Sequence, residues 1–134
     1  MAGYSGTPLD KKLGIKPGAR VLVIDAPDEF EVPGEGVVVR RGPVDVALVF
    51  ATSRSALEEA WTRVTSSLVA DGGFWVAWPK KASKVRTDMT EDVVREVALP
   101  RGLVDNKVCA IDDVWSGLRL VVRKEHRATW EGGR

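Results

Sequence analysis

Segments 20–25, 45–50 and 74–78 of the chain each contain an unbroken run of four or more apolar residues. Runs without apolar–polar alternation are typical of strands that are buried on both faces of a parallel sheet. Between the second and third runs, apolar residues at helical spacing predict an amphipathic helix. Ser53 is placed to cap its start, and an Asp-Gly-Gly sequence at 71–73 is placed to end it. This order predicts a right-handed strand–helix–strand crossover.

Shorter patterns predict elements on both sides of this unit. Pro8 to Gly14 indicate a short helix before the first run, and a second amphipathic helix is predicted from Thr90 to Pro100. Residues 107–112 and 118–123 predict two more strands, whose connection is too short for a parallel return. The last strand is therefore expected to run antiparallel to its predecessor.

These elements predict the organisation of the chain. We expect residues 1–15 to form an N-terminal arm with a short helix, residues 16–125 a single Rossmann-like domain, and residues 126–134 a mobile C-terminal tail. Residues 26–43 contain a valine triplet typical of a strand, but no other periodic pattern, so their structure is not predicted.

Composition narrows the class of protein. The 134 residues carry a formal net charge of +1, which argues against nucleic acid or an anionic membrane as a partner. The single cysteine, Cys109, excludes an internal disulfide and a multi-cysteine metal site, and it favours a reducing compartment. No apolar run approaches the roughly 20 residues that cross a membrane. We therefore expect a cytoplasmic protein without a bound metal.

Several segments resemble class I S-adenosylmethionine-dependent methyltransferases. Residues 16–25 (KPGARVLVID) resemble the opening strand of that superfamily, and residues 45–50 (DVALVF) and 71–76 (DGGFWV) resemble its fourth and fifth strands. The predicted antiparallel pair resembles its sheet ending. The resemblance implies a three-layer, Rossmann-like α/β fold: a truncated, methyltransferase-like, mostly parallel sheet that ends in an antiparallel strand.

The cofactor-binding features of that superfamily are not matched. Its glycine-rich turn directly follows the first strand, whereas residues 25–30 here read DAPDEF, and no glycine occurs before Gly34. Pro27 also lacks an amide hydrogen that such a turn would use. Arg40 and Arg41 stand where the superfamily has a ribose-binding acidic residue. We therefore expect no cofactor, and an S-adenosylmethionine-dependent methyltransferase or cofactor sensor is the alternative.

A closer resemblance is to a small bacterial family of uncharacterised proteins, grouped as a domain of unknown function. It rests on residues 78–83 (WPKKAS), 87–88 (TD), 102–112 (GLVDNKVCAID) and 115–119 (WSGLR). This resemblance spans most of the chain and implies no mechanism.

The strands predict where a ligand would bind. In open parallel sheets, ligands lie beyond the carboxyl ends of the strands. Hydroxyls and amides at a helix start, with nearby lysines, favour a small anion. The predicted ligand-binding residues are Asp25, Thr52, Ser53, Trp78, Lys80, Lys81 and Lys84. A capping role for Ser53 and a solvated surface for the lysines are the alternatives.

The chemistry of the side chains favours binding over catalysis. We find no nucleophile–base pair, so no catalytic residue is predicted, although an enzyme stays open. The leading hypothesis is a non-catalytic binding or regulatory module with a small-anion site at the strand ends. A protein-interaction module is a further alternative, forming a homodimer through an apolar patch near Trp115 or residues 37–39.

Overall fold

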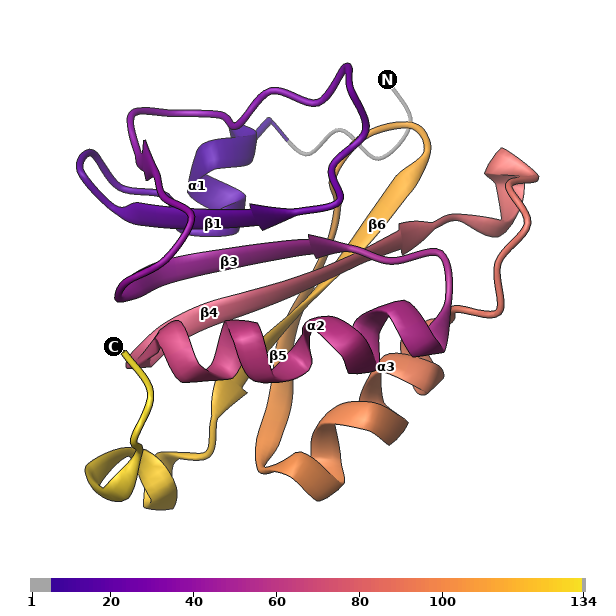
Figure 1. Cartoon of the computed structure of the whole chain (residues 1–134). Coiled ribbons are helices and arrows are strands. Elements are labelled where there is room, and N and C mark those ends of the chain that lie inside the picture. The colour runs from indigo at the N-terminus through magenta and orange to yellow at the C-terminus, as the bar shows by residue number, and fades with distance from the viewer. Residues whose placement is uncertain (1–5, 134) are drawn as a thin grey trace.

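The computed structural model describes residues 6–133, which form an α/β fold around a six-stranded sheet of order β2-β1-β3-β4-β6-β5 (Figure 1). β1 pairs in parallel with β2 and with β3, and β3 pairs in parallel with β4. β6 is antiparallel to both β4 and β5. The predicted truncated, mostly parallel sheet with an antiparallel strand at its end is confirmed. The strands are β1 (Arg20–Ile24), β2 (Val37–Val38), β3 (Val44–Phe50), β4 (Leu68–Pro79), β5 (Leu103–Ala110) and β6 (Trp115–Val122).

Helices on both faces of the sheet give three layers (Figure 1). α2 (Arg54–Ser67) and α3 (Glu91–Ala98) cover one face, and the short α1 (Leu9–Leu13) lies on the other. Each face has its own apolar cluster, because alternate residues of β4 point to opposite sides. Phe74 packs with the residues of α2 and α3, while Trp75 packs with Leu13 of α1. The Trp75 indole Nε1 also donates to the Leu13 carbonyl over 3.0 Å, which attaches α1 to the sheet.

The predicted central helix forms as α2. Its first turn is capped by Ser53, whose side-chain oxygen accepts from the Ala56 amide over 3.1 Å. Trp61 and Val64 are buried against the sheet. α3 begins in the same way, because the Thr90 hydroxyl accepts from the Val93 amide.

The predicted end of the central helix is wrong. The helix stops at Ser67, and the Asp-Gly-Gly sequence at 71–73 lies inside β4. β4 leaves the regular ladder here: Leu68 pairs with Val44, and Gly73 pairs with Val46. Four residues of β4 therefore lie opposite one residue of β3, which is a large, irregular bulge. Glycines suit this bend, so they mark an irregular strand rather than a helix stop.

Residues 26–43 contain little regular structure. β2 is two residues long and pairs beside Arg20 and Val21 of β1. No helix forms between β1 and β2, and this connection packs Phe30 and Val32 against the apolar cluster below α1.

Near the C-terminus, Trp130 and Gly133 contact the end of α2, while residues 124–129 are exposed, and the predicted mobile tail stays a prediction. A 3-10 helix, η3, covers Lys124–Thr129. The Trp130 indole Nε1 then donates to the Leu68 carbonyl over 2.7 Å, at the junction of α2 and β4. The division into arm, domain and tail also stays a prediction. Within residues 6–133, no helix is long and apolar enough to cross a membrane.

Candidate functional site

The carboxyl ends of β1, β3 and β4 meet at one edge of the sheet, on the right of Figure 1. Asp25 follows β1 with an exposed side chain and a left-handed backbone at φ 57°. Thr52 follows β3, and its carbonyl accepts from the Thr87 hydroxyl over 2.7 Å. The structure therefore places both predicted residues at the expected edge, which we call the carboxyl rim.

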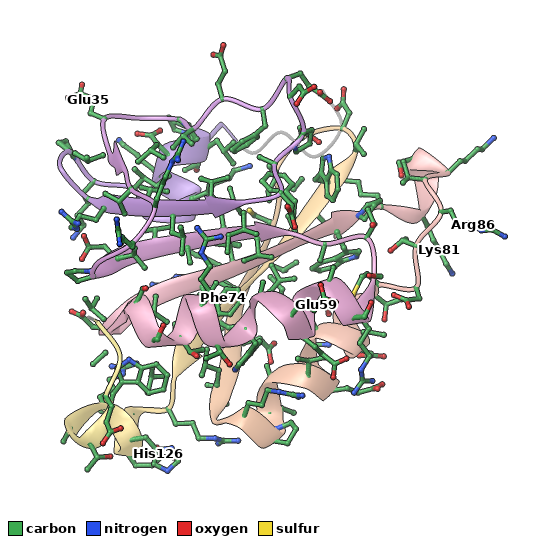
Figure 2. All side chains as sticks on the ribbon, viewed as in Figure 1. Glu35, Glu59, Phe74, Lys81, Arg86 and His126 are labelled. Atoms are coloured by element: carbon green, nitrogen blue, oxygen red, sulfur yellow. The ribbon has the colours of Figure 1, made fainter. Side chains whose placement is uncertain are left out.

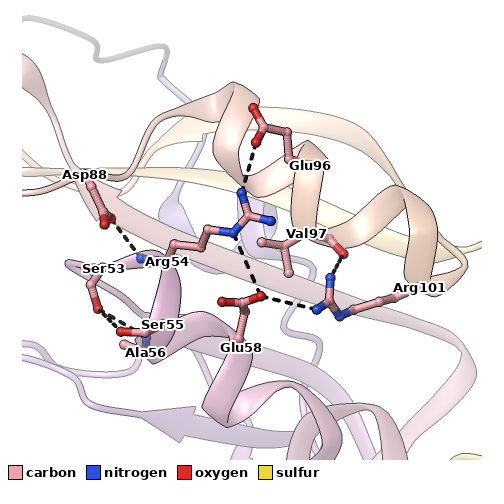
Figure 3. Close-up of polar contacts among 9 residues, drawn as sticks. All are labelled: Ser53, Arg54, Ser55, Ala56, Glu58, Asp88, Glu96, Val97 and Arg101. Carbon is pink, nitrogen blue, oxygen red and sulfur yellow. Dashed lines mark hydrogen bonds and ion pairs between the residues drawn. The ribbon is translucent and has the colours of Figure 1, made fainter.

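The amides at the start of α2 are already occupied by groups of this chain (Figure 3). Ser53 accepts from the Ala56 amide, as in any capped helix. The Asp88 carboxylate accepts from the Arg54 amide over 2.8 Å. A carboxylate at a helix start is stabilised by the helix dipole, so Asp88 takes the place that we predicted for a small anion.

The three predicted lysines do not converge on a common point. The Lys80 ammonium donates to the Asp112 carbonyl over 2.7 Å, in the turn between β5 and β6. Lys81 and Lys84 lie on and after the short 3-10 helix η1 (Lys81–Ser83), and both are exposed. Figure 2 shows Lys81 extending away from the sheet, as Arg86 does. The predicted anion site at this rim stays a prediction, with two exposed lysines to supply charge.

Aromatic side chains fill the carboxyl rim on its α1 side. Trp78, predicted to contact a ligand, is only 8% exposed and packs into the cluster under α2 and α3. On the opposite face, the Phe30 ring lies edge-on to Phe50 with centroids 4.9 Å apart, and Phe50 contacts Trp115 in the same way at 5.0 Å. This group, which we call the aromatic trio, joins the loop after β1 to the ends of β3 and β6.

Charged side chains between α2 and α3 pair with each other rather than forming a site (Figure 3). Arg54 Nη1 lies 3.0 Å from a Glu96 carboxylate oxygen, and Glu58 lies within 3.8 Å of Arg54 and 3.3 Å of Arg101. Arg101 also donates to the Val97 carbonyl over 2.7 Å. Exposed pairs of this kind contribute about 0.2–1 kcal/mol each, so they tie the two helices together modestly.

Two aspartates of β5 and the turn after it, Asp105 and Asp112, have structural roles. The Asp112 carboxylate accepts from the Val114 and Trp115 amides over 2.8 Å, which closes the turn between β5 and β6. Asp105 pairs with Arg95 of α3 over 3.1 Å. Residues 6–133 contain no group of three or more potential metal ligands of the His, Cys, Asp and Glu types.

Cys109 lines a hollow of about 390 Å³ between α1 and β5, together with Lys11, Lys12 and Lys107. Burial raises the pKa of the Cys109 thiol, and the nearby Lys12 and Lys107 only partly oppose this shift. The thiol is therefore neutral near pH 7, which suits packing rather than nucleophilic attack.

A larger hollow, of about 490 Å³, lies at the opposite ends of the strands. Its walls are the turn after α1, the starts of β1 and β3, and the bulge of β4. Arg119 of β6 reaches into it. Sequence reasoning missed this hollow, although two glycines in succession within a strand signal a close approach of other groups. The residues that line it are Gly14, Lys16, Pro17, Gly18, Ala19, Asp45, Val46, Val69, Asp71, Gly72 and Arg119.

Comparisons with known proteins support the fold. No family model and no curated protein matches the sequence. Among solved structures, the chain is similar to a fibrillarin pre-rRNA processing protein of Methanococcus jannaschii. The TM-score is 0.56 at 13% identity, over 94% of this chain and 70% of that chain. A pericyclic reaction enzyme and LepI in complex with SAM each align with a TM-score of 0.49 at 15% identity, over 86% of this chain and 39% of theirs.

The fibrillarin likeness confirms the predicted truncated, methyltransferase-like architecture at the level of fold. One fold supports many activities, so the fold alone does not determine the function of this chain. The resemblance to a small bacterial family stays a prediction, since no family model matches.

Proposed function

We propose that this chain is a non-catalytic binding module on a truncated methyltransferase-like scaffold. The observation that carries the proposal is the aromatic trio at the carboxyl rim. Phe30 lies in the loop where the methyltransferase superfamily has its glycine-rich turn, and its ring packs against Phe50. Phe50 is 3% exposed and is also covered by Trp115. The loop that would otherwise approach an adenosyl cofactor is thus packed through Phe30 against apolar rings of β3 and β6.

Polar groups at the same rim support the proposal. Asp88 already binds the first amide of α2, and the Lys80 ammonium already binds a backbone carbonyl. Asp88 therefore occupies the α2 amide that a small anion would use, and one of the three N–H donors of the Lys80 ammonium is used within the chain. The Cys109 thiol is held neutral by burial, so it is a poor nucleophile.

Calorimetric titration with S-adenosylmethionine and S-adenosylhomocysteine tests the proposal. We expect no saturable heat up to about 1 mM ligand, which corresponds to a binding free energy weaker than about −4 kcal/mol. Micromolar binding to the wild type that is lost in an Asp25→Asn variant would overturn the proposal in favour of a methyltransferase or cofactor sensor. Asp28→Asn is the matched control, because Asp28 is also exposed in the loop after β1.

A homodimer is the second candidate, and the exposed edge of β2 favours it. Val37 is 51% exposed and Val38 is 58% exposed, and each stands on an edge strand that pairs with β1 alone. Unpaired strand edges with apolar side chains favour pairing with another strand. We propose antiparallel pairing of β2 with β2 of a second copy. Sedimentation velocity should show a dimer that Val38→Lys converts to a monomer, and a monomeric wild type would contradict it.

The proposal also includes membership of the small bacterial family that the sequence resembles, and a cytoplasmic location. The single cysteine supports the location, because it cannot form a disulfide within the chain and proteins of reducing compartments rarely contain disulfides.

A further inference from the structure

Arg119 lies against Gly73 of β4, in the hollow at the amino-terminal ends of the strands. A Cβ atom added at Gly73 would lie 2.5 Å from Arg119 Nε and 3.1 Å from Cζ. A Cβ added at Gly72 would lie 3.0 Å from the Asp45 carbonyl oxygen. The absence of a side chain at Gly73 therefore leaves room for the guanidinium on the sheet surface, while Gly72 allows the close approach of the β3 backbone.

The Arg119 guanidinium has little compensation for its burial. Its one hydrogen bond to the residues that the structure describes is a long contact of 3.5 Å, from Nη1 to the Asn106 side-chain oxygen. Among residues 6–133, Arg119 forms no ion pair. Burial lowers the pKa of Arg119, and the nearby Arg127 lowers it further. A guanidinium has five N–H donors, so most of them are available to a ligand.

The other walls of the hollow supply charges of both signs. Lys16, on the turn between α1 and β1, is a second cation. Two carboxylates, Asp45 and Asp71, also line the hollow, and Asp45 is held in place by the Arg20 amide over 2.9 Å. Ala19, Val46 and Val69 add apolar surface. A volume of about 490 Å³ is that of a small-molecule site, which typically measures about 300–1,000 Å³.

We propose that this hollow binds a small organic ligand with a carboxylate or phosphate at one end and an amino or hydroxyl group at the other. The anionic end binds the Arg119 guanidinium, with Lys16 adding charge. The hydrogen-bond donor at the other end faces Asp45 and Asp71. This inference rests on the proposed function, because it names the ligand class of the binding module and places its site at the end opposite the carboxyl rim.

Isothermal titration calorimetry with two pairs of probes tests the ligand class. 4-Aminobutyrate carries a carboxylate and an ammonium, and butylamine is its control without the anion. Adenosine monophosphate carries a phosphate and hydrogen-bond donors, and adenosine is its control. We expect at least one anionic probe to bind and its neutral or cationic control to bind at least tenfold more weakly. The stronger anionic probe identifies the carboxylate or phosphate class.

Two substitutions test the location. Arg119→Gln removes the charge, and Gly73→Ala displaces the guanidinium while keeping every charge of the chain. We expect each to weaken binding of the anionic probe at least tenfold, or about 1.4 kcal/mol. Arg86→Gln is the matched control, because Arg86 is exposed and lies at the far side of the molecule in Figure 2, and it should bind as the wild type does. Circular dichroism melts confirm that each variant is folded.

Two results would overturn the inference. One is the absence of binding by either anionic probe with a Kd below about 10 mM. The other is binding that Arg119→Gln and Gly73→Ala leave unchanged while both remain folded. These failures are distinguishable from failure of the proposed function, which would instead show as binding of the adenosyl cofactor that depends on Asp25.

Discussion

The polar groups at the two ends of the parallel strands differ in how many of them already bind other groups of this chain. At the carboxyl rim, the Arg54 amide of α2 binds Asp88, the Lys80 ammonium binds a carbonyl, and the aromatic trio packs the loop after β1 against β3 and β6. At the amino-terminal ends, Arg119 lies in a hollow without an ion pair to any residue from 6 to 133. We therefore expect the availability of hydrogen-bond donors, as well as strand direction, to decide where a ligand binds.

The largest expected effect tests the closed rim. Phe50→Ala removes the central ring of the aromatic trio, which contacts both Phe30 and Trp115. We expect the free energy of unfolding to fall by about 3–5 kcal/mol, as for other buried Phe-to-Ala changes. Urea denaturation followed by circular dichroism measures it. A loss below about 1 kcal/mol would show that the rim is not a packed region.

A smaller effect tests how α1 is attached beside the hollow. Trp75→Phe keeps an aromatic ring but removes the indole N–H that donates to the Leu13 carbonyl. The buried Leu13 carbonyl then loses its hydrogen-bond donor, so we expect the free energy of unfolding to fall by about 1–3 kcal/mol. Hydrogen exchange of the α1 amides should also accelerate, and unchanged exchange would contradict the attachment. Trp61→Phe is the control on the other face, since no hydrogen bond of its indole links α1 to the sheet.

Asp88→Asn tests whether the chain itself fills the start of α2. The asparagine side chain can still accept a hydrogen bond from the Arg54 backbone amide, but it lacks the negative charge that the helix dipole stabilises. We expect a loss of about 0.3–1 kcal/mol near pH 7. Asp28→Asn should change stability less, because Asp28 is exposed in a loop. Equal effects of the two substitutions would remove the assigned role of Asp88.

The smallest effect concerns the Cys109 hollow. Burial raises the pKa of the thiol, so the folded state favours the neutral form, and this contribution to stability is present below the unfolded pKa of about 8.5. It is lost as pH rises through that value toward the higher folded pKa. Iodoacetamide should therefore alkylate the folded chain with a pH midpoint above that of the urea-unfolded chain. A lower midpoint would mean that Lys12 and Lys107 outweigh burial.

The sequence predicted the parts of the fold that depend on local patterns. Apolar runs and the cap at Ser53 correctly indicated the central strand–helix–strand unit, and the short connection at 113–117 indicated the antiparallel end. The glycines at 72–73 were misread, because a bulge inside a strand and the end of a helix both favour glycine. Residues 26–43 have no periodic pattern, and their conformation depends on packing with residues that are distant in sequence, so it could not be predicted.

The candidate site was harder to predict, because its chemistry depends on residues far apart in sequence. Asp88 reaches the Arg54 amide across 34 positions, so the sequence could not show that the helix start is occupied. Trp78 ends a strand, yet its side chain points toward α2 and α3, where it is buried. From the sequence, Arg119 is an ordinary strand residue, and only the structure shows that Gly73 of β4 lies beneath it.

Amide chemical shifts test the difference between the two ends most directly. Uniformly ¹⁵N-labelled protein is titrated with the stronger anionic probe and, separately, with S-adenosylhomocysteine. The anionic probe should move the amides of Gly18, Gly72 and Gly73 saturably, while S-adenosylhomocysteine should leave both ends unchanged. Saturable shifts at Asp25 and Thr52, with none at the three glycines, would contradict the account and place the ligand at the carboxyl rim.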